Sequence, residues 1–190
     1  MINPSADKLG TETAFGVLAR AGVLAAQGRD IINLGIGQPD FRTPDHIVEA
    51  GIRALRDGAH GYTPSMGLPT LREAVASDIH QRYGIEPDVN LIQIVPGGKP
   101  VLFTAMMLLG GPRHEILTPD PGFPIYQSAI NYSGAKSLSY GLVEKNGFAF
   151  DAKDVLSKIT ERTSLVIVNS PANPTGGVTP RAELDKFVKG

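Results

Sequence analysis

The sequence predicts an α/β fold, with a mostly parallel sheet flanked by helices. Short apolar segments typical of strands alternate with amphipathic segments typical of helices. The segment SLVIV at 164–168 is apolar almost throughout, as in a parallel strand covered on both faces. The chain has 190 residues, of which 42% are hydrophobic. This is enough for the core of one domain or of a large piece of a bigger subunit.

The first half of the chain contains three predicted helices. Residues 11–27 are rich in alanine and compatible with a helix. After a short apolar run, Thr43 is predicted to cap a second helix with Pro44 in its first position, and Gly58 to end it. A loop rich in glycine and proline leads to a third helix, which ends near Gly84. The predicted apolar faces are Ile47, Gly51, Ala54 and Leu55 in the second helix, and Leu71, Val75 and Ile79 in the third.

The second half alternates predicted strands and helices, which favours parallel pairing. Strands are expected at Leu91–Val95, Glu115–Thr118, Lys136–Leu142 and Ser164–Asn169. Helices are expected at Val101–Leu109, which should be buried, at Pro124–Tyr132, and from the N-cap Asp151 to Ile159.

Composition argues against several classes of function. The formal net charge is -1 and the sequence has no block of like charges, so we expect no nucleic-acid partner and no membrane surface. Cysteine is absent and the four histidines lie far apart, so neither a disulfide nor a metal site is expected. There is no pattern of a signal peptide and no apolar run of about 20 residues. We therefore expect a cytoplasmic enzyme or binding domain.

Three unusual segments follow predicted strands. They are PGGK (Pro96–Lys99), PDPGFP (Pro119–Pro124) and NSPANPTGG (Asn169–Gly177). In a parallel sheet they would face one crevice, where ligands bind. Gly97 and Gly98 come directly before a helix, a place that favours a phosphate, although they could equally form only a tight turn. Neither a Walker loop nor a dinucleotide fingerprint is present.

Four further side chains or backbone positions have two interpretations each. Phe123 could stack on a planar heterocycle or belong to the core. Asn173 could donate its amide to a ligand oxygen or form an Asx turn. The hydroxyl of Tyr62 could serve a ligand or face solvent, and Gly37 could expose its N–H to a carboxylate or merely permit a turn.

Taken together, these motifs resemble a known family. The most specific segments are INLGIGQPDF, GYTPSMGLPTLREAV, VPGGK, PDPGFPIY and VNSPANPTGG. In this order and spacing they resemble the class I/II aminotransferases of the aspartate aminotransferase family, which are fold-type I enzymes dependent on pyridoxal 5'-phosphate (PLP). The resemblance covers nearly the whole chain. It implies that the chain is the N-terminal part of such an enzyme.

The resemblance implies a role for each candidate residue. Gly97, Gly98 and Lys99 match the segment that holds the cofactor phosphate. Phe123 matches the aromatic residue that stacks on the pyridine ring. Asn173 matches the asparagine that binds the phenolic oxygen of the ring, beside the substrate.

Two more roles involve a second subunit and the substrate. Tyr62 matches the tyrosine that reaches the phosphate in the neighbouring subunit's site, so a homodimer is expected. Gly37 matches the glycine near the substrate carboxylate. By the same resemblance, residues 1–40 would be an N-terminal arm and small-domain segment, and residues 41–190 the first part of the PLP-binding large domain.

The resemblance implies transfer of an amino group between an α-amino acid and a 2-oxo acid. In the family, the lysine that forms the Schiff base follows the Asn-Pro-Thr-Gly segment, and none of the eight lysines here has its context. No catalytic residue is therefore assigned, and the chain alone is expected to be inactive. Another PLP reaction (a β-lyase or a synthase), a non-catalytic ligand-sensing domain and an inactive remnant remain open.

The family's strand order implies a structural consequence. Leu91–Val95 would lack its neighbours, because these come later in family sequences, whereas the other three strands could still pair. An unpaired strand in an apolar core is costly. We therefore expect the chain alone to aggregate, to rearrange, or to be completed by another chain.

Overall fold

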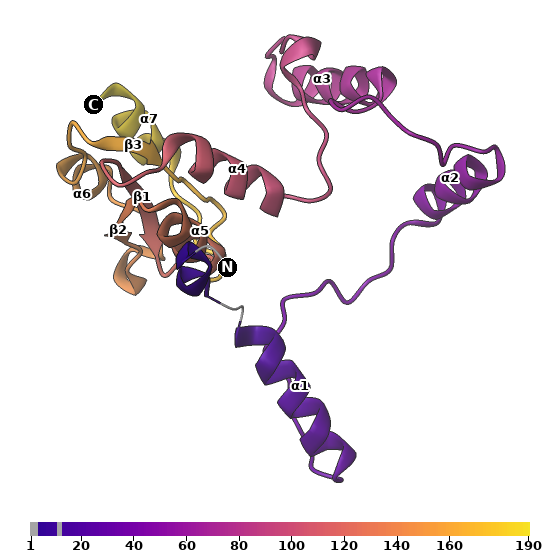
Figure 1. Ribbon diagram of the computed structural model, residues 1–190, viewed down its shortest axis with the longest axis horizontal. Coiled ribbons are helices and arrows are strands. Elements are labelled where there is room, and N and C mark those ends of the chain that lie inside the picture. The colour runs from indigo at the N-terminus through magenta and orange to yellow at the C-terminus, as the bar shows by residue number, and fades with distance from the viewer. Residues whose placement is uncertain (1–3, 11–12) are drawn as a thin grey trace. The chain divides into compact units, whose positions relative to one another are not determined.

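The computed structural model describes residues 4–10 and 13–190 (Figure 1). The chain divides into two compact units. One comprises Gly98–Gly190 with the N-terminal residues through Gly16, and the other is Val17–Gly97. This division falls after Gly97. The division at residue 40 stays a prediction for the family's domain organisation.

A three-stranded parallel sheet forms the centre of the first unit. Its strands are β1 (Glu115–Asp120), β2 (Lys136–Gly141) and β3 (Thr163–Val166), in the order β2-β1-β3. Glu115 is in register with Lys136 on one side and with Thr163 on the other. The prediction of an α/β fold with a parallel sheet is confirmed.

Helices cover both faces of this sheet. Alternate residues of a strand point to opposite faces, so Ile116 and Leu117 enter different apolar clusters. The helices are η1 (Pro4–Lys8), α4 (Lys99–Leu109), α5 (Ile125–Ser133), η3 (Glu144–Asn146), α6 (Ala152–Ser157) and α7 (Arg181–Lys189). The Ile116 cluster contains side chains of α4 and α5, and the Leu117 cluster contains side chains of α6 and α7.

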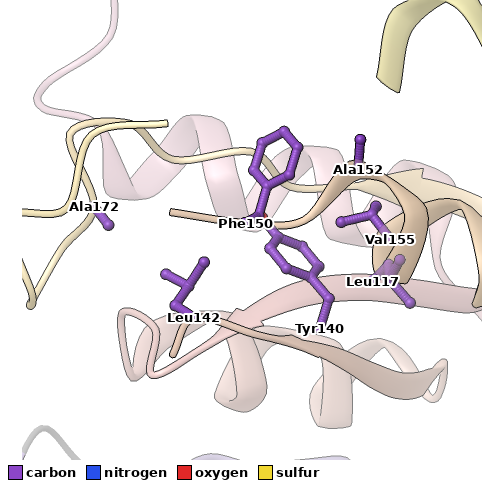
Figure 2. Close-up of a cluster of buried hydrophobic side chains, with 7 residues drawn as sticks. All are labelled: Leu117, Tyr140, Leu142, Phe150, Ala152, Val155 and Ala172. Atoms are coloured by element: carbon purple, nitrogen blue, oxygen red, sulfur yellow. The ribbon is translucent and has the colours of Figure 1, made fainter. Parts of the chain in front are cut away.

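Tyr140 is the largest fully buried side chain of the Leu117 cluster (Figure 2). Its ring meets that of Phe150 edge to face, with 5.9 Å between the ring centroids. Its hydroxyl donates a 2.7 Å hydrogen bond to the backbone oxygen of Ile167, just beyond β3. Burial strongly raises the pKa of Tyr140, so the hydroxyl stays protonated and remains a donor.

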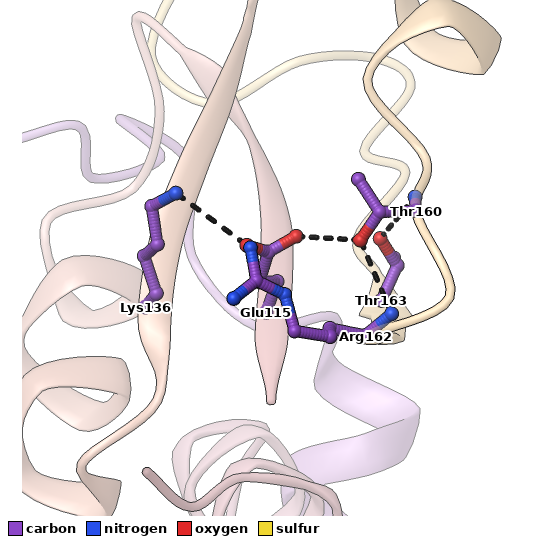
Figure 3. Close-up of polar contacts among 5 residues, drawn as sticks. All are labelled: Glu115, Lys136, Thr160, Arg162 and Thr163. Atoms are coloured by element: carbon purple, nitrogen blue, oxygen red, sulfur yellow. Dashed lines mark hydrogen bonds and ion pairs between the residues drawn. The ribbon is translucent and has the colours of Figure 1, made fainter. Parts of the chain in front are cut away.

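A buried carboxylate connects β1 to the start of β2 and to the loop before β3 (Figure 3). The side chain of Glu115 is 3% exposed, and its Oε1 lies 2.6 Å from Nη2 of Arg162 and 3.4 Å from Nζ of Lys136. The hydroxyl of Thr160 donates a 2.7 Å hydrogen bond to its Oε2. This hydrogen bond, helped by the charge of Arg162, lowers the pKa of Glu115 below its ordinary value of 4.5. The cluster therefore fixes the register of β1, β2 and the loop before β3.

The second unit consists of helices and connecting segments. It contains most of α1 (Thr13–Ala26), together with α2 (Asp45–Arg56), α3 (Pro69–Tyr83) and η2 (Val89–Leu91). None of its described residues is buried. No described helix of the chain is both long enough and apolar enough to cross a membrane.

Helix ends in this unit confirm two predictions and overturn one. Gly58 and Gly84 have φ of +82° and +66°, as expected of residues that end a helix. Thr43 was wrongly predicted as an N-cap. Helix α2 begins at Asp45, and Pro44, with ψ of 139°, takes the cap position without a side-chain hydrogen bond.

The predicted strand Leu91–Val95 is not formed. Leu91 ends a 3-10 helix, and Ile92 is extended but pairs with no described strand. The physical reason is that a strand needs a partner, and the three strands of the sheet pair with one another. The expectation from the family's strand order, that this segment would lack neighbours while the others paired, is confirmed.

Three smaller differences concern the first unit. Helix α4 was predicted to be buried, but within it only Met106 is fully buried, and Leu108 is 77% exposed. Strand β3 ends at Val166 rather than Asn169, and helix α6 ends at Ser157 rather than Ile159. Backbone hydrogen bonds continue just past both ends, from the N–H of Ile167 to the oxygen of Leu117 and from the N–H of Ile159 to the oxygen of Leu156.

Candidate active site

The loops that follow β1 and β3 leave the same edge of the sheet. Because the two strands are parallel, their C-terminal ends lie together. The C-terminal end of α4 lies at the start of β3, where the hydroxyl of Ser164 donates a 2.6 Å hydrogen bond to the backbone oxygen of Leu109. At the other end of α4, the side chain of Lys99 lies near Phe123, in the loop that follows β1.

The turn before α4 is built from two glycines. Gly97 has φ of +84°, a conformation that a residue with a side chain rarely adopts. Gly98 is the N-cap of α4, and no side chain caps this helix. A Cβ atom at either glycine would meet nothing within 4 Å, so the space beside the turn is open. An open glycine turn at a helix start can accept an anion on its backbone N–H groups.

The ring of Phe123 lies near the side chain of Lys99, the first residue of α4. The ammonium nitrogen of Lys99 is 6.0 Å from the centroid of the ring. Phe123 is half-buried, and it meets Tyr126 edge to face at 5.8 Å. It packs against the Ile116 cluster while staying partly exposed. Phe123 is therefore a core residue in part, with ring surface left accessible.

The loop of residues 169–179 is held by side chains of the loop that accept hydrogen bonds from its own backbone. The side-chain oxygen of Asn169 accepts a 2.8 Å hydrogen bond from the N–H of Asn173, and the hydroxyl of Ser170 accepts one of 2.9 Å from the N–H of Thr179. Ala172 is buried in the Leu117 cluster and anchors the loop. Asn173 itself is exposed, with its side-chain amide available at the surface.

Sequence reasoning missed two residues that shape this loop. The side chain of Asn169, four residues earlier, accepts a hydrogen bond from the N–H of Asn173 and so holds the loop. A Cβ atom at Gly177 would lie 2.6 Å from the backbone oxygens of Gly147 and Phe148, so only glycine fits there. The pair Gly176-Gly177 was visible in the sequence, but its close approach to a segment 30 positions earlier was not.

The predicted residues are divided between the two units. Gly98, Lys99, Phe123 and Asn173 belong to the first unit, and Gly97 is the last residue of the second. Tyr62 belongs to the second unit, in the loop before α3, with its side chain fully exposed. Gly37 lies in the second unit at the centre of a tight turn, in which the N–H of Gln38 donates a 3.2 Å hydrogen bond to the backbone oxygen of Ile36, and a Cβ atom there would meet nothing within 4 Å. The functional role of each of these residues stays a prediction.

The chemistry of the first-unit residues suits an anionic aromatic ligand. A glycine turn at a helix start and a lysine can bind a phosphate, an exposed aromatic ring can stack, and an amide can donate a hydrogen bond to an oxygen. Among the described residues, no group of three His, Asp or Glu side chains could hold a metal ion.

Comparison with known proteins identifies relatives of the whole chain. Residues 29–189 match the family model of class I and II aminotransferases. A probable aspartate/prephenate aminotransferase of Aquifex aeolicus (strain VF5) is 40% identical over 173 residues, which are 91% of this chain and 44% of that protein. An aspartate aminotransferase of Bacillus subtilis (strain 168) is 34% identical over 172 residues, 90% of this chain and 44% of the relative.

Solved structures agree with these relatives. The aspartate aminotransferase of Thermus thermophilus with maleate matches with a TM-score of 0.93 at 32% identity, and the match covers 100% of this chain and 50% of that one. The alanine aminotransferase of Pyrococcus furiosus matches with a TM-score of 0.92 at 29% identity over 100% of this chain and 49% of that one. The chain thus spans about half the length of the proteins it matches. The family model covers most of the sequence, and the chain belongs to the class I and II aminotransferases.

Proposed function

We propose that the full-length gene product is a PLP-dependent aminotransferase that moves an amino group between an α-amino acid and a 2-oxo acid. One observation carries the proposal: the Phe123 and Asn173 loops leave the same edge of the parallel sheet, and the side chain of Lys99 lies near Phe123, in a chain of this family. We further propose a cytoplasmic homodimer, on the strength of the family resemblance.

The phosphate of PLP would bind at the start of α4. The backbone N–H groups around Gly97 and Gly98 would accept phosphate oxygens, and Lys99 would add a positive charge. The open space beside both glycines supports this role, because a side chain at either position would fill it. No step of the reaction is assigned to Lys99, which would act as an anchor.

The pyridine ring would be held by two residues of the same unit. Phe123 would stack on the ring, which its partly exposed position supports. The side-chain amide of Asn173 would donate a hydrogen bond to the phenolic oxygen beside the substrate, while Asn169 keeps the loop in shape. When bound, PLP supplies the electron sink for loss of the proton from the substrate Cα.

The remaining two residues would complete the site. The hydroxyl of Tyr62 would reach the phosphate held by the partner subunit, which its full exposure supports. Gly37 would present its N–H to the substrate carboxylate, which the open space around it supports.

The test is cofactor binding and amino transfer by the full-length gene product. Purified protein should bind PLP with a visible absorbance band that borohydride removes. It should also transfer the amino group of aspartate, the first donor to test because the curated relatives are named for it.

Asn173→Ala should lower the amino-transfer rate at least about tenfold. The matched control Asn146→Ala, an exposed asparagine in η3, should leave the rate unchanged. A protein that binds no PLP would overturn the proposal.

A further inference from the structure

Gly67 forms a close contact inside the second unit. Its φ is +94°, and a Cβ atom built on it would lie 2.6 Å from both Cβ and Cγ1 of Ile94. Next to it, the backbone N–H of Ile94 donates a 3.0 Å hydrogen bond to the backbone oxygen of Met66. The loop before α3 therefore touches the segment after η2 through backbone atoms, with no room for a side chain at Gly67.

Further hydrogen bonds hold the two segments of this contact. The N–H of Gly67 donates a 2.8 Å hydrogen bond to the backbone oxygen of Pro64, which closes the turn before α3. Nη1 of Arg72, in the first turns of α3, donates a 3.0 Å hydrogen bond to the backbone oxygen of Val89 in η2. One hydrogen bond therefore holds the turn before α3, and the other holds η2 against α3. We refer to Gly67, Ile94 and Met66 as the Gly67 joint.

The predicted phosphate turn lies a short distance along the chain from this joint. Gly97 follows Ile94 by three positions, with only Val95 and Pro96 between them, so a shift of Ile94 has few residues over which to be absorbed. We propose that Gly67 is a positioning residue of the cofactor site: its close contact with Ile94 fixes the segment that leads into the phosphate turn at Gly97. This inference rests on the proposed function.

An alanine at position 67 has two separable effects. It adopts the positive φ with strain, as it would at any such glycine. It also drives Ile94 away, because carbon atoms in ordinary contact are about 3.5–4.0 Å apart. Gly84 is the matched control: its φ is +66°, and a Cβ atom there would meet nothing within 4 Å. Gly84→Ala therefore reproduces the strain without the displacement.

The experiment compares two ligands in the full-length gene product. Equilibrium dialysis gives the affinity for PLP and for pyridoxal, which lacks the phosphate. A displacement on the order of 1 Å in a binding site can cost one to two powers of ten. We expect Gly67→Ala to weaken PLP binding about tenfold or more and pyridoxal binding less than about twofold. Gly84→Ala should change neither affinity more than about twofold.

A double mutant tests the contact itself. Ile94→Gly removes both atoms that an alanine at position 67 would meet. On that background, Gly67→Ala should weaken PLP binding less than about threefold, because coupled residues are not additive. If Gly67→Ala does not fold, Arg72→Met, which removes the hydrogen bond to Val89, takes its place with the same expected preference for loss of PLP over pyridoxal.

The outcomes separate this inference from the proposed function. If the parent protein binds no PLP, the proposed function fails. If the parent binds PLP but Gly67→Ala weakens PLP and pyridoxal by equal factors, or no more than Gly84→Ala does, the joint affects folding only and the inference is overturned.

Discussion

Helices α5 and α2 are both amphipathic, yet only α5 has its apolar side chains covered. Ala129 and Ile130 of α5 are 1% and 0% exposed against the sheet, whereas Ile47 and Leu55 of α2 are 52% and 65% exposed. The difference is not in helix formation, since both segments form. A helix forms from local signals, but its burial requires a second layer, which the first unit supplies and the second does not.

The two extended segments differ in the same way. Glu115–Asp120 lies between two parallel partners and is buried over its first five residues. Residues 92–95 have a comparable apolar sequence but no partner strand among the described residues. The predicted phosphate turn therefore connects a segment fixed by the Gly67 joint to a helix fixed by the sheet.

The largest expected difference in the free energy of unfolding is between alanine mutations of two leucines, one in each unit. In the 190-residue chain, Leu117→Ala should lower the free energy of unfolding by about 3 kcal/mol, because Leu117 is fully buried and leaves a cavity. Leu55→Ala, at an exposed position of α2, should change it by less than about 0.5 kcal/mol. Urea denaturation measures both. A loss at Leu55 as large as that at Leu117 would mean that the apolar face of α2 is covered.

Two glycines give the next contrast. Gly177→Ala should lower the free energy of unfolding by about 2 kcal/mol, since its Cβ atom would collide with two backbone oxygens. Gly51→Ala, inside α2 with nothing within 4 Å, should raise the stability of that helix by up to about 1 kcal/mol. Thermal unfolding followed by circular dichroism measures both. Destabilisation by Gly51→Ala would show a close neighbour at α2.

Mutation of two tyrosines to phenylalanine should give a smaller difference in the free energy of unfolding. Tyr140→Phe leaves the backbone oxygen of Ile167 without its 2.7 Å hydrogen bond and should lower the free energy of unfolding by about 1 kcal/mol. Tyr83→Phe, at a residue that is 69% exposed, should cost almost nothing. Equal costs in urea denaturation would contradict the difference in packing between the units.

The last prediction concerns how stability changes with pH at Glu115. Its pKa is lower in the folded chain than its ordinary value of 4.5, so its contribution is fully present above pH 4.5 and is lost as the pH falls through the folded value. Glu115→Gln should therefore show a shallower loss of stability below pH 4.5 than the parent. Acid titrations of the unfolding midpoint measure this slope. Identical slopes would mean that the carboxylate does not link the strands.

Local features of the fold were predictable from the sequence. Asp151 caps α6 as predicted, by accepting a 2.8 Å hydrogen bond from the N–H of Lys153, and Gly84 ends α3. Thr43 failed because Pro44, extended in ψ, took the cap position. Leu91–Val95 failed because strand pairing depends on residues far away in the sequence.

Less of the site could be predicted. Unusual turn composition identified the loops of Gly98, Phe123 and Asn173, because parallel strands end at one edge. The residues that hold those loops were not identified, since their partners lie elsewhere. The hydrogen bond of Asn169 to the N–H of Asn173, and the contact of Gly67 with Ile94, could be recognised only once the backbone was folded.

Hydrogen–deuterium exchange of the 190-residue chain tests most directly the claim that the sheet unit alone has a packed core. We expect the amides of Leu117 and Leu138 in the sheet to exchange slowest, with protection that approaches global stability. The amides of α2 and α3 should exchange far faster, close to the rate of isolated helices. Equal protection in the sheet and in α2 and α3 would contradict the account.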